Sequence, residues 1–279
     1  MKDSPNRSFG QSLMARRTIT RLIYIAAPIG ATSYGIHRGL SHLEEKYPNL
    51  PASENASKAL LAPRNPIIQR CAYSDIFAAR IPLQALEAQI PSFEKQDQIA
   101  LEEAWARAVL GSRILRLEGS FVGLINKRKF SPGDTGEHGF GPRENGEPQE
   151  LLNGVLYTQR TPEADADSQG LLIAWYMADE PRIFFEKCAH WGYPWRLMSG
   201  GRHEMSVSAP YEVPGQGRVV DVRFAGAHDY EIFEEEGVKQ KVIPGWVMRL
   251  HAGYARLILD LAVREVMDKY EKGKARELS

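Results

Sequence analysis

The chain has few cysteines and no excess of charge. Only Cys71 and Cys188 carry thiols, and they lie too far apart in the 279-residue sequence to form a CxxC motif or a zinc-ligand cluster. The sequence therefore predicts no disulfide framework, although two thiols can still pair, and so low a count fits a reducing compartment. The formal net charge is +0. The molecule as a whole thus has no bias toward polyanions, which disfavours nucleic-acid binding.

The N-terminal region lacks both acidic residues and a long apolar run. Residues 1–43 carry six Lys and Arg against Asp3 alone, a net charge of +5, and their apolar segment, residues 22–36, contains Pro28. A membrane span needs roughly 20 predominantly apolar residues, whereas acid-poor termini containing Arg and Ser are typical of organelle transit peptides. We expect a mitochondrial-type targeting or membrane-docking segment, with membrane contact through residues 13–40. The alternatives are a short membrane anchor and a disordered basic tail. With such a tail, the protein would be cytoplasmic.

Motifs for cofactors and nucleophiles are missing as well. The chain contains no GxxxxGK[ST] and no GxSxG, and no clean GxGxxG stands between a strand and a helix. We therefore expect no cofactor and no metal. The segment 127–150 has five glycines and three prolines and is predicted to be a long surface loop. A lid that holds Asp134 or His138 over a pocket is the alternative.

The remaining sequence predicts one folded domain. Residues 44–68 contain four prolines and no sustained period, which is typical of a linker. A single α+β domain is expected over residues 69–272, followed by a frayed tail at 273–279. Helices are predicted within 83–89 and 96–126, the second broken at Gly111 and Gly119. Strands are predicted at 72–81, 151–160, 171–177, 202–209, 218–225 and 228–233.

A long C-terminal helix completes the predicted fold. Apolar residues recur at three- and four-residue steps between Trp246 and Tyr270. Serial strands with short turns favour an antiparallel sheet. The predicted fold class is therefore α+β, with a curved antiparallel sheet packed on a long C-terminal helix and a basic N-terminal extension.

This order of elements resembles the START-like helix-grip superfamily, which includes polyketide cyclases and lipid-transfer domains. The segments 194–204 (PWRLMSGGRHE) and 228–232 (HDYEI) also resemble segments of fungal proteins with no established activity. The resemblance implies an apolar ligand held between the concave face of the sheet and the last helix. The expected ligand-binding residues are Trp175, Val222, Arg223, Tyr230 and Tyr254.

Three histidines on different elements suggest acid–base chemistry in such a cavity. Imidazole suits proton transfer near neutral pH, so His203, His228 and His251 are the candidate catalytic groups, with Asp221 or Asp229 as a partner that orients one of them. Tyr230 or Arg223 is expected to polarise a carbonyl group. A structural role for each histidine is the alternative.

Three functions remain open at this point. The first is binding or transfer of a hydrophobic small molecule, either a lipid or a polyketide-like compound. The second is a cofactor-free cyclase, dehydratase or isomerase that uses the same cavity. The third is a structural or interaction protein with a filled core. A cavity of ligand size would separate the first two from the third.

Overall fold

A computed structural model describes residues 32–90, 97–162 and 170–277. The chain divides into two compact units, Met1–Lys46 and Tyr47–Ser279. In the first unit the described residues, 32–46, form a helix. The targeting or membrane-docking segment expected over residues 1–43 lies largely outside the described residues.

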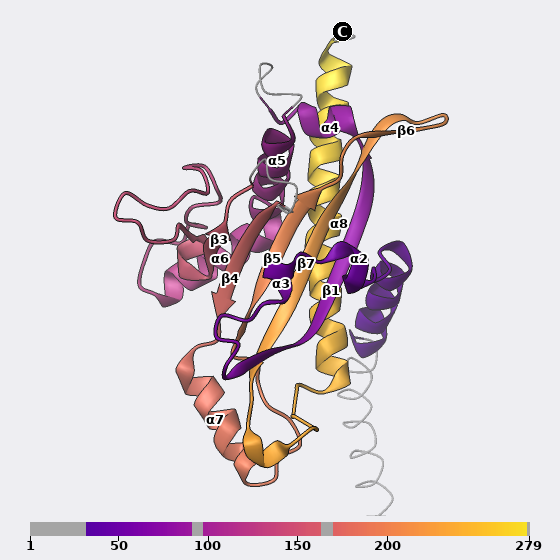
Figure 1. Ribbon diagram of the computed structural model, residues 1–279. Helices are drawn as coiled ribbons and strands as arrows, with labels where there is room; N and C mark the ends of the chain where they lie inside the picture. Colours follow the sequence, from indigo (N-terminus) through magenta and orange to yellow (C-terminus); the bar gives the residue numbers. More distant parts are fainter. Residues whose placement is uncertain (1–31, 91–96, 163–169, 278–279) are drawn as a thin grey trace, which may run out of the picture. The chain divides into compact units, whose positions relative to one another are not determined.

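The second unit is built on a curved, unclosed antiparallel sheet (Figure 1). The strand order is β1-β7-β5-β4-β3-β2, and β6 pairs with β7. The strands are β1 (Gln69–Pro82), β2 (Glu150–Leu151), β3 (Leu156–Arg160), β4 (Leu171–Tyr176), β5 (Gly200–Val207), β6 (Tyr211–Val213) and β7 (Gly217–Glu231). The predicted α+β class, with a sheet packed on a long C-terminal helix, is confirmed.

Helices cover both faces of this sheet (Figure 1). Helices α4 (Leu83–Glu87), α5 (Gln98–Leu110), α6 (Arg113–Ile125) and α8 (Gly245–Glu277) lie on one side, which we call the helix face. Helices α2 (Ala52–Asn55) and α3 (Lys58–Leu61) lie on the other. Helix α7 (Asp179–His190) follows β4, and short 3-10 turns occupy Leu152–Gly154 and Glu234–Glu236.

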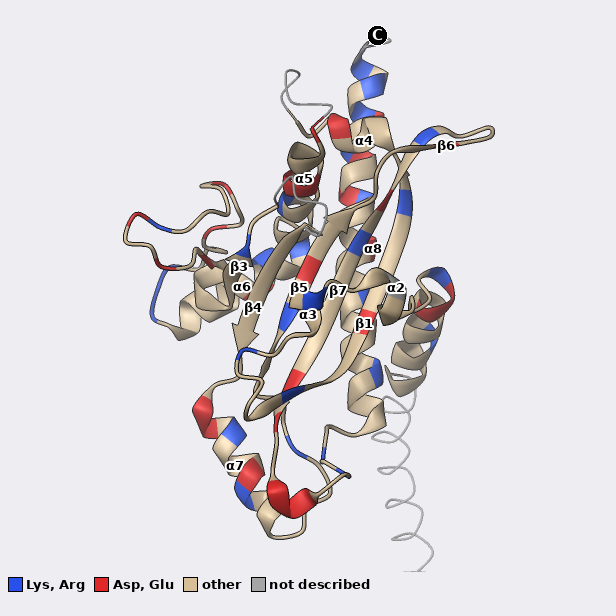
Figure 2. Cartoon of the chain, in the orientation of Figure 1, with Lys and Arg blue, Asp and Glu red and all other residues tan. Residues whose placement is uncertain are grey.

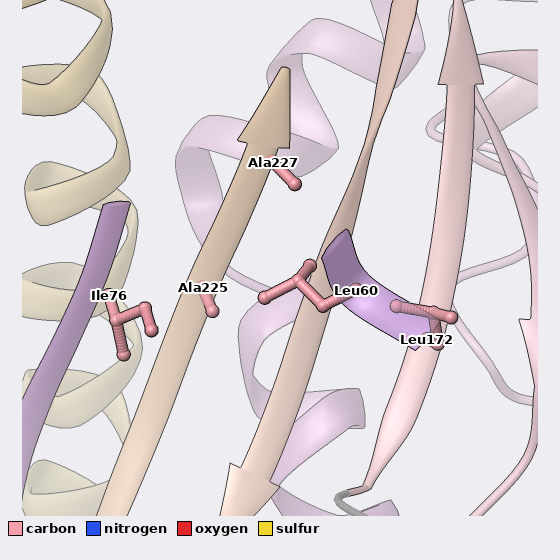
Figure 3. Close-up of a cluster of buried hydrophobic side chains, with 5 residues drawn as sticks. All are labelled: Leu60, Ile76, Leu172, Ala225 and Ala227. Atoms are coloured by element: carbon pink, nitrogen blue, oxygen red, sulfur yellow. The ribbon is translucent and has the colours of Figure 1, made fainter. Parts of the chain in front are cut away.

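The stretch predicted to be a linker is part of the folded unit. Leu60 of α3 is completely buried among Ile76, Leu172, Ala225 and Ala227 of the sheet (Figure 3). A Ser57 side chain begins α3 by accepting a hydrogen bond from the Leu60 amide, 3.0 Å away. Four prolines over this stretch suggested a chain without contacts, but the stretch forms two helices of one turn each.

Strand β7 is continuous where the sequence predicted two strands. It runs for 15 residues, and its small residues Ala225, Gly226 and Ala227 pair with β1 on one side and β5 on the other. These residues resemble a turn when only neighbours in sequence are considered. In the sheet their small size admits Leu60 on one face and the ring of His203 on the other.

Helix α8 is longer than its sequence pattern indicated. It has 33 residues and continues to Glu277, through the segment predicted to be a frayed tail. Two hydrogen bonds hold the middle of α8 to Tyr47: the Tyr47 hydroxyl donates to Asp260 (2.9 Å), and the Tyr47 carbonyl accepts from Arg256 Nε (2.8 Å).

The two glycines predicted to break the helical region 96–126 differ in their effect. Gly111 ends α5 as predicted, whereas Gly119 lies inside α6 without breaking it.

Candidate functional site

Five aromatic and imidazole side chains meet on the helix face of the sheet. Tyr73 (β1), Trp175 (β4), His203 (β5) and His228 (β7) come from four strands, and His251 comes from α8. The strand register places them together, because Tyr73 pairs with His228 and the glycines opposite the other rings carry no side chain. We call these five residues the histidine cluster.

The rings of the histidine cluster are in mutual contact. The Tyr73 ring stacks on His228 with centroids 4.4 Å apart, and the His251 ring meets the edge of His228 at 4.6 Å. The Trp175 ring lies 6.4 Å from His203 and 6.3 Å from His228. Such distances place all five groups around one small volume between the sheet and α8.

Two glycines make this arrangement possible. A Cβ atom at Gly201 would lie 2.8 Å from the indole of Trp175 and 2.3 Å from the Ala227 carbonyl oxygen. At Gly226 it would lie 3.3 Å from His203 Nδ1 and 3.6 Å from His228 Nε2. The absence of side chains at these two positions therefore leaves the room that the rings occupy.

Several polar atoms of the cluster are buried without a partner. Among the described residues, nothing hydrogen-bonds to Nδ1 of His203, Nδ1 of His228 or Nε1 of Trp175. The Tyr73 hydroxyl is different, because it interacts with the hydroxyl of Tyr230, whose ring centroid lies 6.3 Å from its own. A buried polar group without a hydrogen bond costs about 1–3 kcal/mol. Three such nitrogens at one place indicate a site suited to a polar ligand atom.

Burial keeps the imidazoles neutral. It lowers the pKa of His203 to about 3, with His251 acting in the same direction and the backbone of Ala225 opposing it. It lowers the pKa of His228 to about 2, with His251, His203 and Arg202 adding to the effect. The pKa of His251 is lowered by burial as well. At neutral pH each ring thus offers one donor and one acceptor nitrogen.

One carboxyl group approaches the cluster. Asp75 of β1 has Oδ2 3.9 Å from Nε2 of His228, too far for a hydrogen bond. Burial raises the pKa of Asp75, and the Arg256 guanidinium opposes this rise. Asp75 could thus accept or return a proton near His228 if a ligand bridged the two.

An apolar cluster adjoins the histidines. Met198, Tyr230 and Ile243 form its buried centre. The residues around this centre are only partly buried: Ala72, Tyr73, Trp175, Met177, Leu197, Val242, Val247 and Met248. Tyr73 and Trp175 belong to both groups, so the apolar cluster and the histidine cluster form one continuous surface. Its polar part is well buried, and the periphery of its apolar part is partly exposed.

Only some of the expected site residues lie together in the structure. His203, His228, His251, Trp175 and Tyr230 lie together as expected. Val222 is on the same face but completely enclosed among other side chains. The Tyr254 hydroxyl donates to Glu118 Oε2 of α6 over 2.5 Å, so it is engaged away from the histidines.

The remaining expected residues lie on the opposite face of the sheet. Strand alternation puts Asp221, Arg223 and Asp229 on the side of Ala225 and Ala227. Asp221 accepts a hydrogen bond from Tyr211 (2.8 Å) and Asp229 binds Arg202. None of the three can therefore orient a histidine of the cluster.

Sequence reasoning missed Tyr73, Asp75 and the two glycines. The alternation of β1 placed Tyr73 on one strand face with Phe77 and Ile81, and Asp75 has the same parity. The signal for these two was present. Gly201 and Gly226 gave no local signal, because their role depends on pairing between distant strands.

Comparison with known proteins adds no family to this geometry. No family model matches the chain, and no curated protein or solved structure matches it either. Within the described ranges, three His, Cys, Asp or Glu side chains do not come together in a way that could hold a metal ion. Cys71 and Cys188 are free thiols. None of the helices that the structure describes has the length and apolarity needed to cross a bilayer.

The fold and the site together define a class of protein. It is an α+β protein in which a curved antiparallel sheet and a long C-terminal helix enclose a neutral histidine cluster beside an apolar surface.

Proposed function

We propose that this protein binds a hydrophobic small molecule, a lipid or a polyketide-like compound, between the sheet and α8. The observation that carries the proposal is the set of buried, unpaired nitrogens on His203, His228 and Trp175. A ligand oxygen in the histidine cluster would satisfy them. The apolar body of the ligand would lie against Met248, Val247 and their neighbours, which pack on the buried centre and remain partly exposed.

Binding agrees better than catalysis with the protonation of the site. A general base works best when its pKa lies near the operating pH, whereas the pKa of His203 is about 3 and that of His228 about 2. Neutral imidazoles of this kind are weak bases but good hydrogen-bond partners. They suit recognition of a carbonyl or hydroxyl group.

One observation favours a second candidate, a cofactor-free cyclase, dehydratase or isomerase. Asp75 lies beside His228, and the pKa of its carboxyl group is raised toward neutrality. A carboxyl group near a neutral imidazole can exchange a proton with a substrate that lies between them. In this reading Asp75 is the acid–base group, a role different from the orienting role expected for Asp221.

Native mass spectrometry of the full chain, followed by denaturing extraction, tests the binding proposal. We expect a stoichiometric hydrophobic compound, and we expect His203→Phe and His228→Phe to lower its occupancy at least tenfold because each removes hydrogen-bonding nitrogens. The matched control is His138→Phe, a histidine whose side chain is 78% exposed in a loop. Occupancy in this control should equal that of the wild type.

Two outcomes would contradict the proposal. A well-folded protein that carries no compound and takes up no fatty acid or polyketide probe would favour the structural or interaction protein. The protein could instead convert a bound carbonyl probe. If Asp75→Asn abolished this conversion while the probe stayed bound, the result would favour the cyclase, dehydratase or isomerase.

A further inference from the structure

Helix α6 exposes an apolar face on the surface of the protein. Its members are Leu117, Phe121, Leu124 and Ile125 of the helix and Phe130 just after it, and their side chains are from 50% to 76% exposed. The helical positions recur at steps of four, three and one, so they share one side of α6. The Phe130 ring packs edge-on against Phe121 at 5.7 Å, which extends the face beyond the helix end. We call these five residues the α6 apolar face.

The opposite side of α6 fixes this orientation. Leu115, Gly119, Ser120 and Gly123 are buried. The Asn153 side chain donates to the Gly119 carbonyl (3.0 Å) and to the Ser131 carbonyl (2.7 Å), tying the helix to the segment after it. A rotation of α6 that hid the apolar face would break these contacts. The exposure is therefore a property of the packed helix.

Basic residues flank the α6 apolar face at both ends. Two of them precede Leu117, and three lie between Ile125 and Phe130. All five are exposed: Arg113, Arg116, Lys127, Arg128 and Lys129. Figure 2 shows the blue stretch that follows α6. Between residues 113 and 130 the sole acid is Glu118, which accepts the hydrogen bond of Tyr254. The segment itself thus carries a net charge of +4. Arg128 pairs with Glu150 (3.1 Å) and Arg113 lies 3.9 Å from Glu265.

We propose that α6 docks this protein on a membrane surface that contains anionic lipids. A helix with an apolar face and a basic border lies in the membrane interface, where its apolar side chains reach the acyl chains and its cations meet the headgroups. The charge disfavours a second copy of this chain as the occupant, because a two-fold contact would bring two basic segments together. This inference is independent of the ligand proposed for the histidine cluster and concerns a different element.

Vesicle co-sedimentation of the full chain tests the inference. The vesicles contain phosphatidylcholine with roughly 30% phosphatidylserine, or phosphatidylcholine alone. We expect binding to the anionic vesicles only, weakened by added salt. The double variant Phe121→Ser/Leu124→Ser and the charge variant Lys127→Glu/Lys129→Glu should each bind at least about tenfold more weakly.

A control variant removes exposed apolar surface elsewhere. Phe184→Ser/Trp191→Ser alters two exposed aromatic side chains on and after α7, and it should bind as the wild type does. Circular dichroism and urea unfolding confirm that each variant is folded.

Three results would overturn the inference. The first is that the α6 variants bind anionic vesicles with an affinity within about twofold of the wild type. That result would place any membrane contact in the basic N-terminal region. The second is a protein that is dimeric in solution and becomes monomeric with Phe121→Ser/Leu124→Ser. The third is a folded wild type that ignores anionic vesicles altogether, which would leave a protein partner for this face.

Discussion

Arg202 and Asp229 form a salt bridge that is almost completely buried beneath α3. Arg202 Nη2 donates to Asp229 Oδ1 over 2.7 Å, and Arg202 Nε donates to the Leu60 carbonyl over 2.7 Å. The pair thus connects β5, β7 and α3. Burial raises the pKa of Asp229, while Arg202 acts to lower it.

Loss of one partner should destabilise the protein strongly. We expect Arg202→Met to lower the free energy of unfolding by about 3–5 kcal/mol, because it leaves a buried carboxylate without its cation. The double variant Arg202→Met/Asp229→Leu should recover much of this loss. Urea unfolding at neutral pH measures both. Equal destabilisation of the single and double variants would contradict a dominant role for the unpaired charge.

The buried histidines should make the protein less stable in mild acid. Between about pH 3 and 6.5 the unfolded chain binds a proton at His203 that the folded protein does not bind. The same holds for His228 between about pH 2 and 6.5. Stability therefore rises with pH in this window. Burial raises the pKa of Glu102 to about 7 and also raises the pKa of Asp75, Asp229 and Glu204, and these carboxyl groups act with the opposite sign. A histidine variant is therefore needed to isolate the contribution of the imidazoles.

Urea unfolding at two pH values tests this linkage. From pH 7 to pH 5 each histidine should contribute a loss of about 2 kcal/mol. The variant His203→Phe should therefore lose about 2 kcal/mol less than the wild type over the same interval. The exposed His138→Phe variant should behave as the wild type does. Identical pH dependence in all three proteins would show that His203 is protonated normally in the folded state.

At the scale of elements, patterns within a single helix or strand predicted the fold well. The period of three and four residues in α8 and the alternation in β1, β5 and β7 rest on the regular directions in which a helix or a strand points its side chains. Helices α2 and α3 escaped detection because a single turn has no period. The position of α3 on the sheet depends on Leu60, whose contacts are with residues of three strands distant in sequence.

Leu60 provides the prediction at this scale. Leu60→Ala should lower the free energy of unfolding by about 2–5 kcal/mol, because it leaves a cavity against the sheet. The neighbouring Leu61 is only partly buried, so Leu61→Ala should cost clearly less. Thermal or urea unfolding of the two variants gives the comparison. Equal effects would indicate that α3 lies loosely on the sheet.

At the scale of the whole molecule, the folded unit begins at Tyr47 rather than near residue 69. The segment before β1 supplies Tyr47 to α8, Ser57 to Glu204 and Leu60 to the sheet. The contacts of Ser57 and Leu60 close the face of the sheet opposite α8, whereas Tyr47 joins the segment to α8 itself. The single-domain expectation for residues 69–272 thus omitted about twenty residues that complete the core.

A pair of truncated proteins tests this boundary. The protein that starts at residue 47 should unfold cooperatively, whereas one that starts at residue 69 should lose several kcal/mol of stability or fail to fold, because it exposes Ile76, Leu172 and Ala225. Circular dichroism during heating distinguishes them. Equal melting temperatures would show that α2 and α3 are dispensable.

The sequence by itself determined the class of fold, the antiparallel sheet and the long last helix. These features repeat with the local period of a strand or helix, so neighbours in the chain reveal them. Only the tertiary structure decided that Asp75 approaches His228, that Asp221 and Asp229 face away, and that Gly201 and Gly226 make room for the rings. Those outcomes depend on which strands pair and in which register, which contacts between distant residues set.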